Sequence, residues 1–321
     1  MPELPEVETV RRRLADVLPG LVVGDVVVND PVVSVQTAAE LRDALRGRRV
    51  VALRRRGKYL IVELDGVLLV VHLRMTGRLL LAPEPGGGAP RFAARLLPAG
   101  ELLFYDTRRF GRVWALPAAS EDQFFAAMGP EPFGASFTTD YLRAALEGRT
   151  APLKSFLLDQ RRIAGVGNIY ADEAAFRARL NPLRVAGSLG PGEVARLRDA
   201  LLETLQLGID HEGASIESFV DPAGARGAFQ EILNVYGRGG EPCRACGTPV
   251  WRLELGGRGT HFCPRCQPLP RGRRLAPSGR AALERERLRR ATARRATAPA
   301  GGPARRRAPR RSDDRPGRGS L

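Results

Sequence analysis

The four cysteines of the chain lie within 24 residues, as two Cys-x-x-Cys pairs with sixteen residues between them. They are Cys243, Cys246, Cys263 and Cys266. Each pair can supply two thiolates from one tight turn, and this spacing is typical of a tetrahedral zinc site. Two disulfides are the alternative, which a reducing compartment disfavours. Because four thiolates leave no position for a water, the pattern predicts one structural Zn²⁺.

The segment between the two cysteine pairs predicts a β-hairpin. Val250–Leu255 and Thr260–Phe262 are apolar or β-branched runs on either side of a Gly-Gly turn. His261 lies close to the cysteines in sequence, but the zinc needs no fifth ligand. We therefore expect His261 to be a surface or packing residue.

The rest of the chain changes from strand-like to helix-like patterning near residue 120. Residues 5–18 have apolar positions at helical spacing, and Pro19-Gly20 ends that helix. Short apolar runs separated by turn signals then continue to Leu116. After residue 120, segments such as Asn168–Arg179 and Pro191–Ile209 are typical of helices. This order predicts an α+β fold, with an N-terminal helix and an antiparallel β-sandwich before a helical region.

The net charge of +16 is concentrated at the C-terminus. Residues 271–321 contain 17 arginines against 4 acidic residues, which accounts for +13. Residues 269–321 have few leucines and no aromatic residue, so we expect them to be disordered. The preceding part is nearly neutral, but its basic residues are clustered, for example at 46–56 and 108–112. Clustered arginines on a nearly neutral domain indicate a polyanion as partner.

The N-terminus gives no sign of export. It is acidic and lacks the basic-then-apolar order of a signal peptide, and no apolar run approaches the length of a membrane span. We therefore expect a cytoplasmic protein with no membrane contact.

Only two of the 51 basic residues are lysines, Lys58 and Lys154. Where charge alone is needed this chain uses arginine, so a retained lysine is a candidate for a compact ammonium or an amine that loses its proton. Chance is the alternative. Lys154 lies upstream of a glycine-containing loop at 160–167 that leads into the helix beginning near Asn168. Such a helix start can bind a phosphate, although an ordinary turn between helices has the same spacing.

Seven motifs in order resemble the formamidopyrimidine-DNA glycosylase family, whose members excise oxidised purines from DNA. The motifs are Pro2–Glu8, Gly57–Tyr59, His72–Gly77, Asp106–Gly111, Gly165–Ala171, Val235–Arg238 and the four-cysteine segment. Leu4 favours the purine-directed branch, because relatives of the endonuclease VIII type begin with Pro-Glu-Gly-Pro.

The resemblance implies a division of the chain into five parts. Residues 1–120 would form the catalytic β-sandwich domain and 121–134 a linker. Residues 135–237 would form a helix-two-turn-helix DNA-binding domain, 238–268 the zinc finger and 269–321 the disordered tail. It also implies a monomer that acts on damaged double-stranded DNA in the nucleoid.

The resemblance further implies a catalytic set of Pro2, Glu3 and Lys58. After removal of Met1, Pro2 would present a secondary amine, whose pKa near 8 makes it a better nucleophile than lysine at neutral pH. Its attack on the sugar would form a Schiff base, followed by β- and δ-elimination. Glu3 would transfer protons to the sugar, and Lys58 would contact phosphate and donate a proton.

Other residues match the family's DNA contacts. Phosphate contacts would come from Arg91, Lys154, Asn168, Arg258 and the segment containing Tyr236, whereas the space left by a flipped nucleotide would be filled by Met75, Arg108 and Phe110. The loop at 224–229 departs from the family's usual Gly-Lys-Pro-Gly-Tyr-Phe sequence. A glycosylase directed at oxidised pyrimidines is therefore the main alternative, and a non-catalytic DNA-binding relative is a second one.

Overall fold

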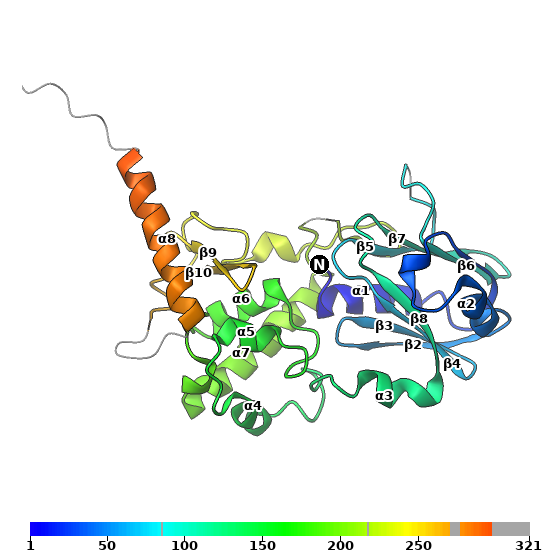
Figure 1. Cartoon of the computed structure of the whole chain (residues 1–321), viewed down its shortest axis with the longest axis horizontal. Helices are drawn as coiled ribbons and strands as arrows, with labels where there is room; N and C mark the ends of the chain where they lie inside the picture. Colours follow the sequence, from blue (N-terminus) through cyan, green and yellow to red (C-terminus); the bar gives the residue numbers. More distant parts are fainter. Residues whose placement is uncertain (85, 217, 270–276, 297–321) are drawn as a thin grey trace, which may run out of the picture.

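The computed structural model describes residues 1–84, 86–216, 218–269 and 277–296, and it contains a β-sandwich beside a helical region (Figure 1). The sandwich has two four-stranded sheets whose neighbouring strands are all antiparallel. One sheet has the order β1 (Val22–Val28), β6 (Phe92–Leu97), β7 (Glu101–Asp106) and β5 (Gly77–Leu80). The other has the order β2 (Val50–Arg56), β3 (Tyr59–Leu64), β4 (Val67–His72) and β8 (Arg112–Pro117). The predicted fold class is confirmed.

Both faces of the second sheet are covered. Val67, Leu69 and Val71 of β4 face the sandwich core, which α2 (Ala38–Leu45) also joins. On the opposite face, Leu68 and Val70 pack with Phe125 of α3 (Glu121–Phe125). Residues 121–134, predicted as a linker, therefore begin with a helix that packs on the sheet, because its phenylalanines bury apolar surface there.

The helical region contains α4 (Thr139–Leu146), α5 (Leu153–Leu158), α6 (Asn168–Arg177) and α7 (Pro191–Asp210). Their apolar residues form one core around Tyr170, Leu197 and Leu201. The segment at 160–167 is a loop that leads from α5 into α6, as predicted. No helix within the described ranges is both long and apolar enough to cross a membrane.

Helix α1 (Leu4–Ala15) belongs to both cores and joins the two regions. Leu4 packs in the core of the helical region, whereas Val7, Val10 and Leu14 pack in the sandwich. The N-terminus of the chain therefore lies at the junction of the two regions, near the middle of the molecule (Figure 1).

The finger consists of the two cysteine turns and the hairpin of β9 (Trp251–Leu255) and β10 (Arg258–Phe262). Helix α8 (Pro277–Ala296) packs against this hairpin and lies in the segment that was predicted to be disordered. That prediction was wrong for these residues. Ala282 and Leu283 are buried against the hairpin, and alanine, arginine, glutamate and leucine favour helix. The rest of the predicted tail beyond Leu269 lies outside the described residues.

Candidate active site

The carboxylate of Glu3 lies at the N-terminus of α6, between the two regions. It accepts hydrogen bonds from the backbone N–H groups of Ile169 at 2.9 Å and Tyr170 at 3.4 Å, and Glu3 is 1% exposed. A Cβ at Gly167 would lie 2.3 Å from the Glu3 Cδ, so glycine is needed at that position. The helix start that could have bound a phosphate is therefore capped by a carboxylate of the protein itself.

Glu3 and Lys58 interact in surroundings that disfavour both charges. Burial raises the pKa of the Glu3 carboxyl above its ordinary value, and the nearby Lys58 opposes that rise. Burial likewise lowers the pKa of Lys58 to about 8, with Glu3 as the main opposing group. Groups whose pKa values move towards neutrality are suited to proton transfer.

Pro2 is buried and lines a small cavity of about 40 Å³. Its walls include Met75 from the β4–β5 loop, Ile169 from α6 and Tyr236 from the segment before the finger. The structure thus brings Pro2, Met75 and Tyr236, to which the family resemblance gave separate roles, to one cavity. Met1 also lines this cavity, so its removal would open space beside the Pro2 nitrogen.

Lys58 lies on the turn between β2 and β3, and Glu131 holds this turn from the connection after α3. Glu131 accepts a hydrogen bond from the Gly57 backbone N–H at 2.5 Å. It also pairs with Arg55 at 2.8 Å and Arg56 at 3.1 Å. Gly57 has a φ of +57°, a left-handed conformation that favours glycine. The position of Lys58 therefore depends on a carboxylate that our sequence analysis did not select.

Lys154 is almost fully buried and joins α5, α6 and the finger. Its Nζ pairs with Asp172 Oδ1 at 2.8 Å and donates to the Gly259 carbonyl at 2.7 Å. Asn168 Nδ2 donates to the same carbonyl at 3.1 Å, and the other oxygen of Asp172 accepts from the His261 backbone N–H at 2.9 Å. Lys154 and Asn168, each predicted to contact phosphate, thus both bind one carbonyl of the finger hairpin. His261 is a buried packing residue.

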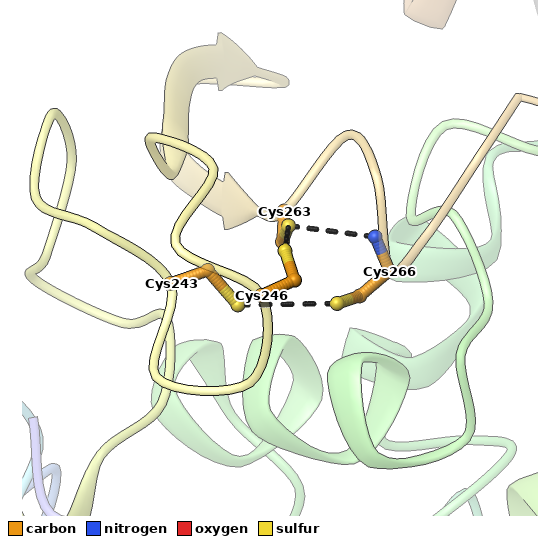
Figure 2. A group of neighbouring side chains, drawn as sticks. All are labelled: Cys243, Cys246, Cys263 and Cys266. Carbon is orange, nitrogen blue, oxygen red and sulfur yellow. Dashed lines mark hydrogen bonds between the residues drawn. The ribbon is translucent and has the colours of Figure 1, made fainter.

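The four cysteine thiols converge in the finger (Figure 2). Their Sγ atoms all lie within 4.8 Å of one another, with Cys243 and Cys266 at 3.9 Å and Cys246 and Cys263 at 3.5 Å. A tetrahedron with Zn–S bonds of about 2.3 Å has edges of about 3.8 Å. The set therefore fits a structural Zn²⁺, and the four thiols are not joined as disulfides.

Two loops of the sandwich are fastened together through Asp106. Its carboxylate accepts hydrogen bonds from the Thr76 hydroxyl and, at 2.6 Å, from the Gly111 backbone N–H. The backbone N–H of Arg108 donates to Thr76 Oγ1 at 3.1 Å, and the Arg108 guanidinium lies 5.0 Å from the centre of the Phe110 ring. Phe110 is 49% exposed, so a fixed loop presents an aromatic ring and a cation to solvent.

The predicted phosphate contacts at Arg91 and Arg258 differ in their surroundings. Arg91 is half-buried, pairs with Asp30 and donates to the backbone carbonyl of Asp106. Arg109, which we did not select, pairs with the same Asp30 at 2.7 Å. Arg258 is exposed at the start of β10. Arg258 is thus open to a ligand, whereas Arg91 is engaged within the protein.

Two further carboxylates hold the walls of the Pro2 cavity. Glu6 accepts from the Tyr170 hydroxyl at 2.7 Å and from the Ala214 N–H at 2.8 Å. Glu173 accepts from the Tyr236 N–H at 2.9 Å. Both residues lie in or next to motifs noted above, but their partners are far away in sequence. The signal that the sequence offered was an acidic residue within or beside such a motif.

The loop at 224–229 lies close to the segment that leads into this cavity. A Cβ at Gly227 would lie 2.3 Å from the Gly213 carbonyl oxygen, and the Gly227 N–H donates to Ser215 Oγ at 2.9 Å. The next residues along that segment, Ile216, Ser218 and Phe219, line the cavity. The altered loop is therefore positioned to affect the shape of this cavity.

Family models match three successive parts of the chain. They describe the formamidopyrimidine-DNA glycosylase N-terminal domain at residues 1–113, the formamidopyrimidine-DNA glycosylase H2TH domain at 128–220, and a zinc finger found in FPG and IleRS at 240–269. The formamidopyrimidine-DNA glycosylase of Heliobacterium modesticaldum is 50% identical over 276 residues, covering 83% of this chain and 100% of the relative. That of Pelotomaculum thermopropionicum is 43% identical, covering 83% and 99%.

Solved structures give the same result. The MutM (Fpg) protein of Thermus thermophilus is 46% identical with a TM-score of 0.76, covering 83% of this chain and 98% of that one. A Lactococcus lactis Fpg mutant in complex with DNA containing Fapy-dG is 35% identical with a TM-score of 0.79, covering 84% and 100%. The wild-type Lactococcus lactis protein, 35% identical with a TM-score of 0.77 over the same shares, was solved with DNA containing an oxidised pyrimidine.

Proposed function

The chain belongs to the formamidopyrimidine-DNA glycosylase family, and we propose that this enzyme excises oxidised purines from duplex DNA through its N-terminal proline. It is a DNA glycosylase and AP lyase with a structural zinc site. The observation that carries the proposal is the interaction of Lys58 with Glu3, the residue that follows Pro2 in the chain, at the junction of the two regions. The substrates are 8-oxoguanine and formamidopyrimidines, and the protein acts as a monomer in the nucleoid.

The Pro2 amine, freed by removal of Met1, attacks the sugar C1′ and displaces the damaged base, which leaves with the electron pair of the glycosidic bond and takes up a proton. The Pro2 nitrogen then gives up its remaining proton, the ring C1′–O4′ bond opens as O4′ gains a proton, and a cationic iminium remains between C1′ and the Pro2 nitrogen. This cation withdraws electrons, so the C2′ proton is lost and the 3′ phosphate leaves by β-elimination. Loss of a further proton expels the 5′ phosphate by δ-elimination. Hydrolysis of the iminium regenerates the amine.

Glu3 and Lys58 move the protons in this scheme. Their pKa values shift towards neutrality, Glu3 follows Pro2 directly in the chain, and Lys58 interacts with Glu3. Glu3 protonates the sugar O4′ as the ring opens, and Lys58 protonates the departing base while contacting a phosphate. The hydrogen bonds from α6 fix the Glu3 carboxylate, so that it needs little rearrangement during the reaction.

The remaining residues bend and hold the duplex. Met75, Arg108 and Phe110 enter the stack where the damaged nucleotide has left, which offsets an unstacking cost of about a few kcal/mol. Arg258 binds a phosphate, and Asn168 and Lys154 contact phosphates only if their bonds to the Gly259 carbonyl open. None of these contacts carries sequence information. Tyr236 lines the cavity that receives the sugar. Arg91 contacts phosphate only if its pair with Asp30 opens.

The experiment compares duplexes that carry 8-oxoguanine, an oxidised pyrimidine or a preformed abasic site, with borohydride present to trap the iminium. We expect fastest excision of 8-oxoguanine and a trapped adduct with all three. Faster excision of the oxidised pyrimidine would instead support the second candidate, a pyrimidine-directed enzyme, which the altered loop at 224–229 favours. Tight binding without excision or trapping would contradict both and indicate a non-catalytic relative.

A further inference from the structure

Helix α8 lies outside the part of the chain that matches the relatives. Those relatives are covered over 98–100% of their own length, but they cover only 83–84% of this chain. The zinc-finger family model ends at residue 269, before α8 begins at Pro277. This helix is therefore an addition to the fold shared with these relatives, and their known activity does not account for it.

The helix is docked on the back of the finger hairpin (Figure 1). Side chains alternate along a strand, so the two faces of the hairpin have different partners. Gly259 and His261 face Lys154 and Asp172 of the helical region. The opposite face carries Leu253, Leu255 and Phe262, which form one buried cluster with Leu183 and with Ala282 and Leu283 of α8. The hairpin that bears Arg258 is thus held between the helical region and α8.

The docking of α8 is close. A Cβ at Gly279 would lie 3.0 Å from the Leu183 carbonyl oxygen, so the missing side chain lets the helix approach that backbone. Ala282 is 2% exposed and Leu283 is 4% exposed. The apolar contacts of α8 therefore face the finger and leave its charged positions outside.

The outer side of α8 is rich in arginine. Arg280, Arg285, Arg287 and Arg289 are exposed, against an exposed Glu284 and a half-buried Glu286. A helix of 20 residues is about 30 Å long, close to one turn of duplex DNA at about 34 Å. Duplex DNA carries one negative charge for about every 1.7 Å of its axis, and guanidinium groups bind phosphate oxygens in pairs.

We propose that α8 is an additional binding element for the phosphate backbone of duplex DNA, mounted on the finger beside Arg258. It extends the contact with the duplex beyond the damaged site. This inference rests on the proposed function, in that its ligand is the DNA that the enzyme repairs. The apolar face fastens the helix to the hairpin, and the exposed arginines on either side of it bind phosphates without reading sequence.

The test uses the full chain with Arg280, Arg285, Arg287 and Arg289 all changed to glutamine, and a matched control with the same four changed to lysine. Binding to undamaged duplexes of about one and about three helical turns is measured by fluorescence anisotropy across a salt series. On the longer duplex, the slope of log affinity against log salt should fall in magnitude by about two to four for the glutamine variant. The lysine variant should keep the parental slope.

Two readouts keep this test separate from the proposed function. Single-turnover excision of 8-oxoguanine at saturating enzyme should be unchanged in the glutamine variant, whereas failure of the proposed function would appear as lack of excision in the parent. Zinc content and thermal unfolding show that the glutamine variant is folded. Leu283→Ala is a second variant, which weakens the apolar contact of α8 with the hairpin and keeps all four arginines. Its salt slope should fall by a smaller amount. An unchanged slope in the folded glutamine variant would overturn the proposal.

Discussion

The surroundings of Lys58 and those of Lys154 bury an ammonium group by different means. Lys154 is 1% exposed and has an ion pair with Asp172 and a carbonyl acceptor at Gly259. Lys58 is 5% exposed on a turn that Glu131 holds through its backbone, and burial lowers its pKa to about 8. Burial lowers the pKa of Lys154 as well, but its ion pair with Asp172 opposes that shift and joins the finger to the helices, whereas Lys58 is prepared to exchange a proton. The chain's preference for arginine elsewhere makes the contrast testable.

Replacement of Lys58 should have the largest effect on chemistry. Lys58→Arg keeps the charge but supplies a larger group that does not give up its proton, so excision of 8-oxoguanine should fall by about 100-fold or more. Strand cleavage at a preformed abasic site should be nearly unchanged, because no base has to be protonated there. Single-turnover assays on the two duplexes measure both effects. Equal losses on both would remove the distinction that we draw between the two lysines.

The finger should fail as a unit when its metal is lost. Cys246→Ser should abolish stoichiometric zinc binding and lower duplex affinity by about tenfold or more, because the hairpin that bears Arg258 loses its support. The β-sandwich should stay folded, since it has a core of its own. Mass spectrometry of the native protein and anisotropy measure these changes. Full affinity in a metal-free variant would show that DNA binding does not depend on the finger to which Lys154 is joined.

Removal of the acidic partner should affect stability more than chemistry. Asp172→Asn leaves the buried Lys154 without its ion pair, which should lower the free energy of unfolding by about 3 kcal/mol. Excision by the folded variant should fall by less than about tenfold. Adding Lys154→Met should recover part of the lost stability, because no unpaired charge is then buried. A double variant no more stable than Asp172→Asn alone would show that the ion pair is not the cause.

The pH dependence should identify which lysine exchanges a proton. The pKa of Lys58 is lowered to about 8, so its protonated fraction falls as pH rises above that value. If protonated Lys58 is the donor, 8-oxoguanine excision should fall by about tenfold between pH 8 and pH 9.5. Lys58→Arg should lose this limb. His72 does not contribute, because burial lowers its pKa to about 3 and it stays neutral throughout. A flat profile in the parent would contradict the assigned role.

The smallest effect should come from the exposed tip of the hairpin. Arg258→Ala removes one phosphate contact, so the salt slope of binding should fall in magnitude by about one, equally for damaged and undamaged duplexes. Anisotropy over a salt series measures it, and Arg196→Ala, at an exposed position on α7, serves as a matched control. A loss confined to damaged DNA would assign Arg258 to lesion recognition instead.

Local patterns in the sequence predicted the strands, the helices and the metal site, because each depends on residues close together in the chain. The spacing within and between the two cysteine pairs, for instance, is enough to indicate a zinc site. Contacts between residues far apart in the sequence were not predicted, such as Glu3 with Ile169 or Glu131 with Gly57. The residues next to either carboxylate do not indicate which distant group it will contact. Helix α8 was missed for a related reason. Its composition resembles a disordered tail, and its apolar residues gain stability only against the finger.

The most direct test of the account is the identity of the residue that carries the DNA after borohydride trapping on an 8-oxoguanine duplex. The adduct is digested with protease and nuclease, and the modified peptide is mapped by mass spectrometry, with a chain extended at its N-terminus as the control. The account predicts that the modification lies on the amine of Pro2 and that the extended chain gives no adduct. An adduct on Lys58 or Lys154, or one that survives the extension, would contradict it.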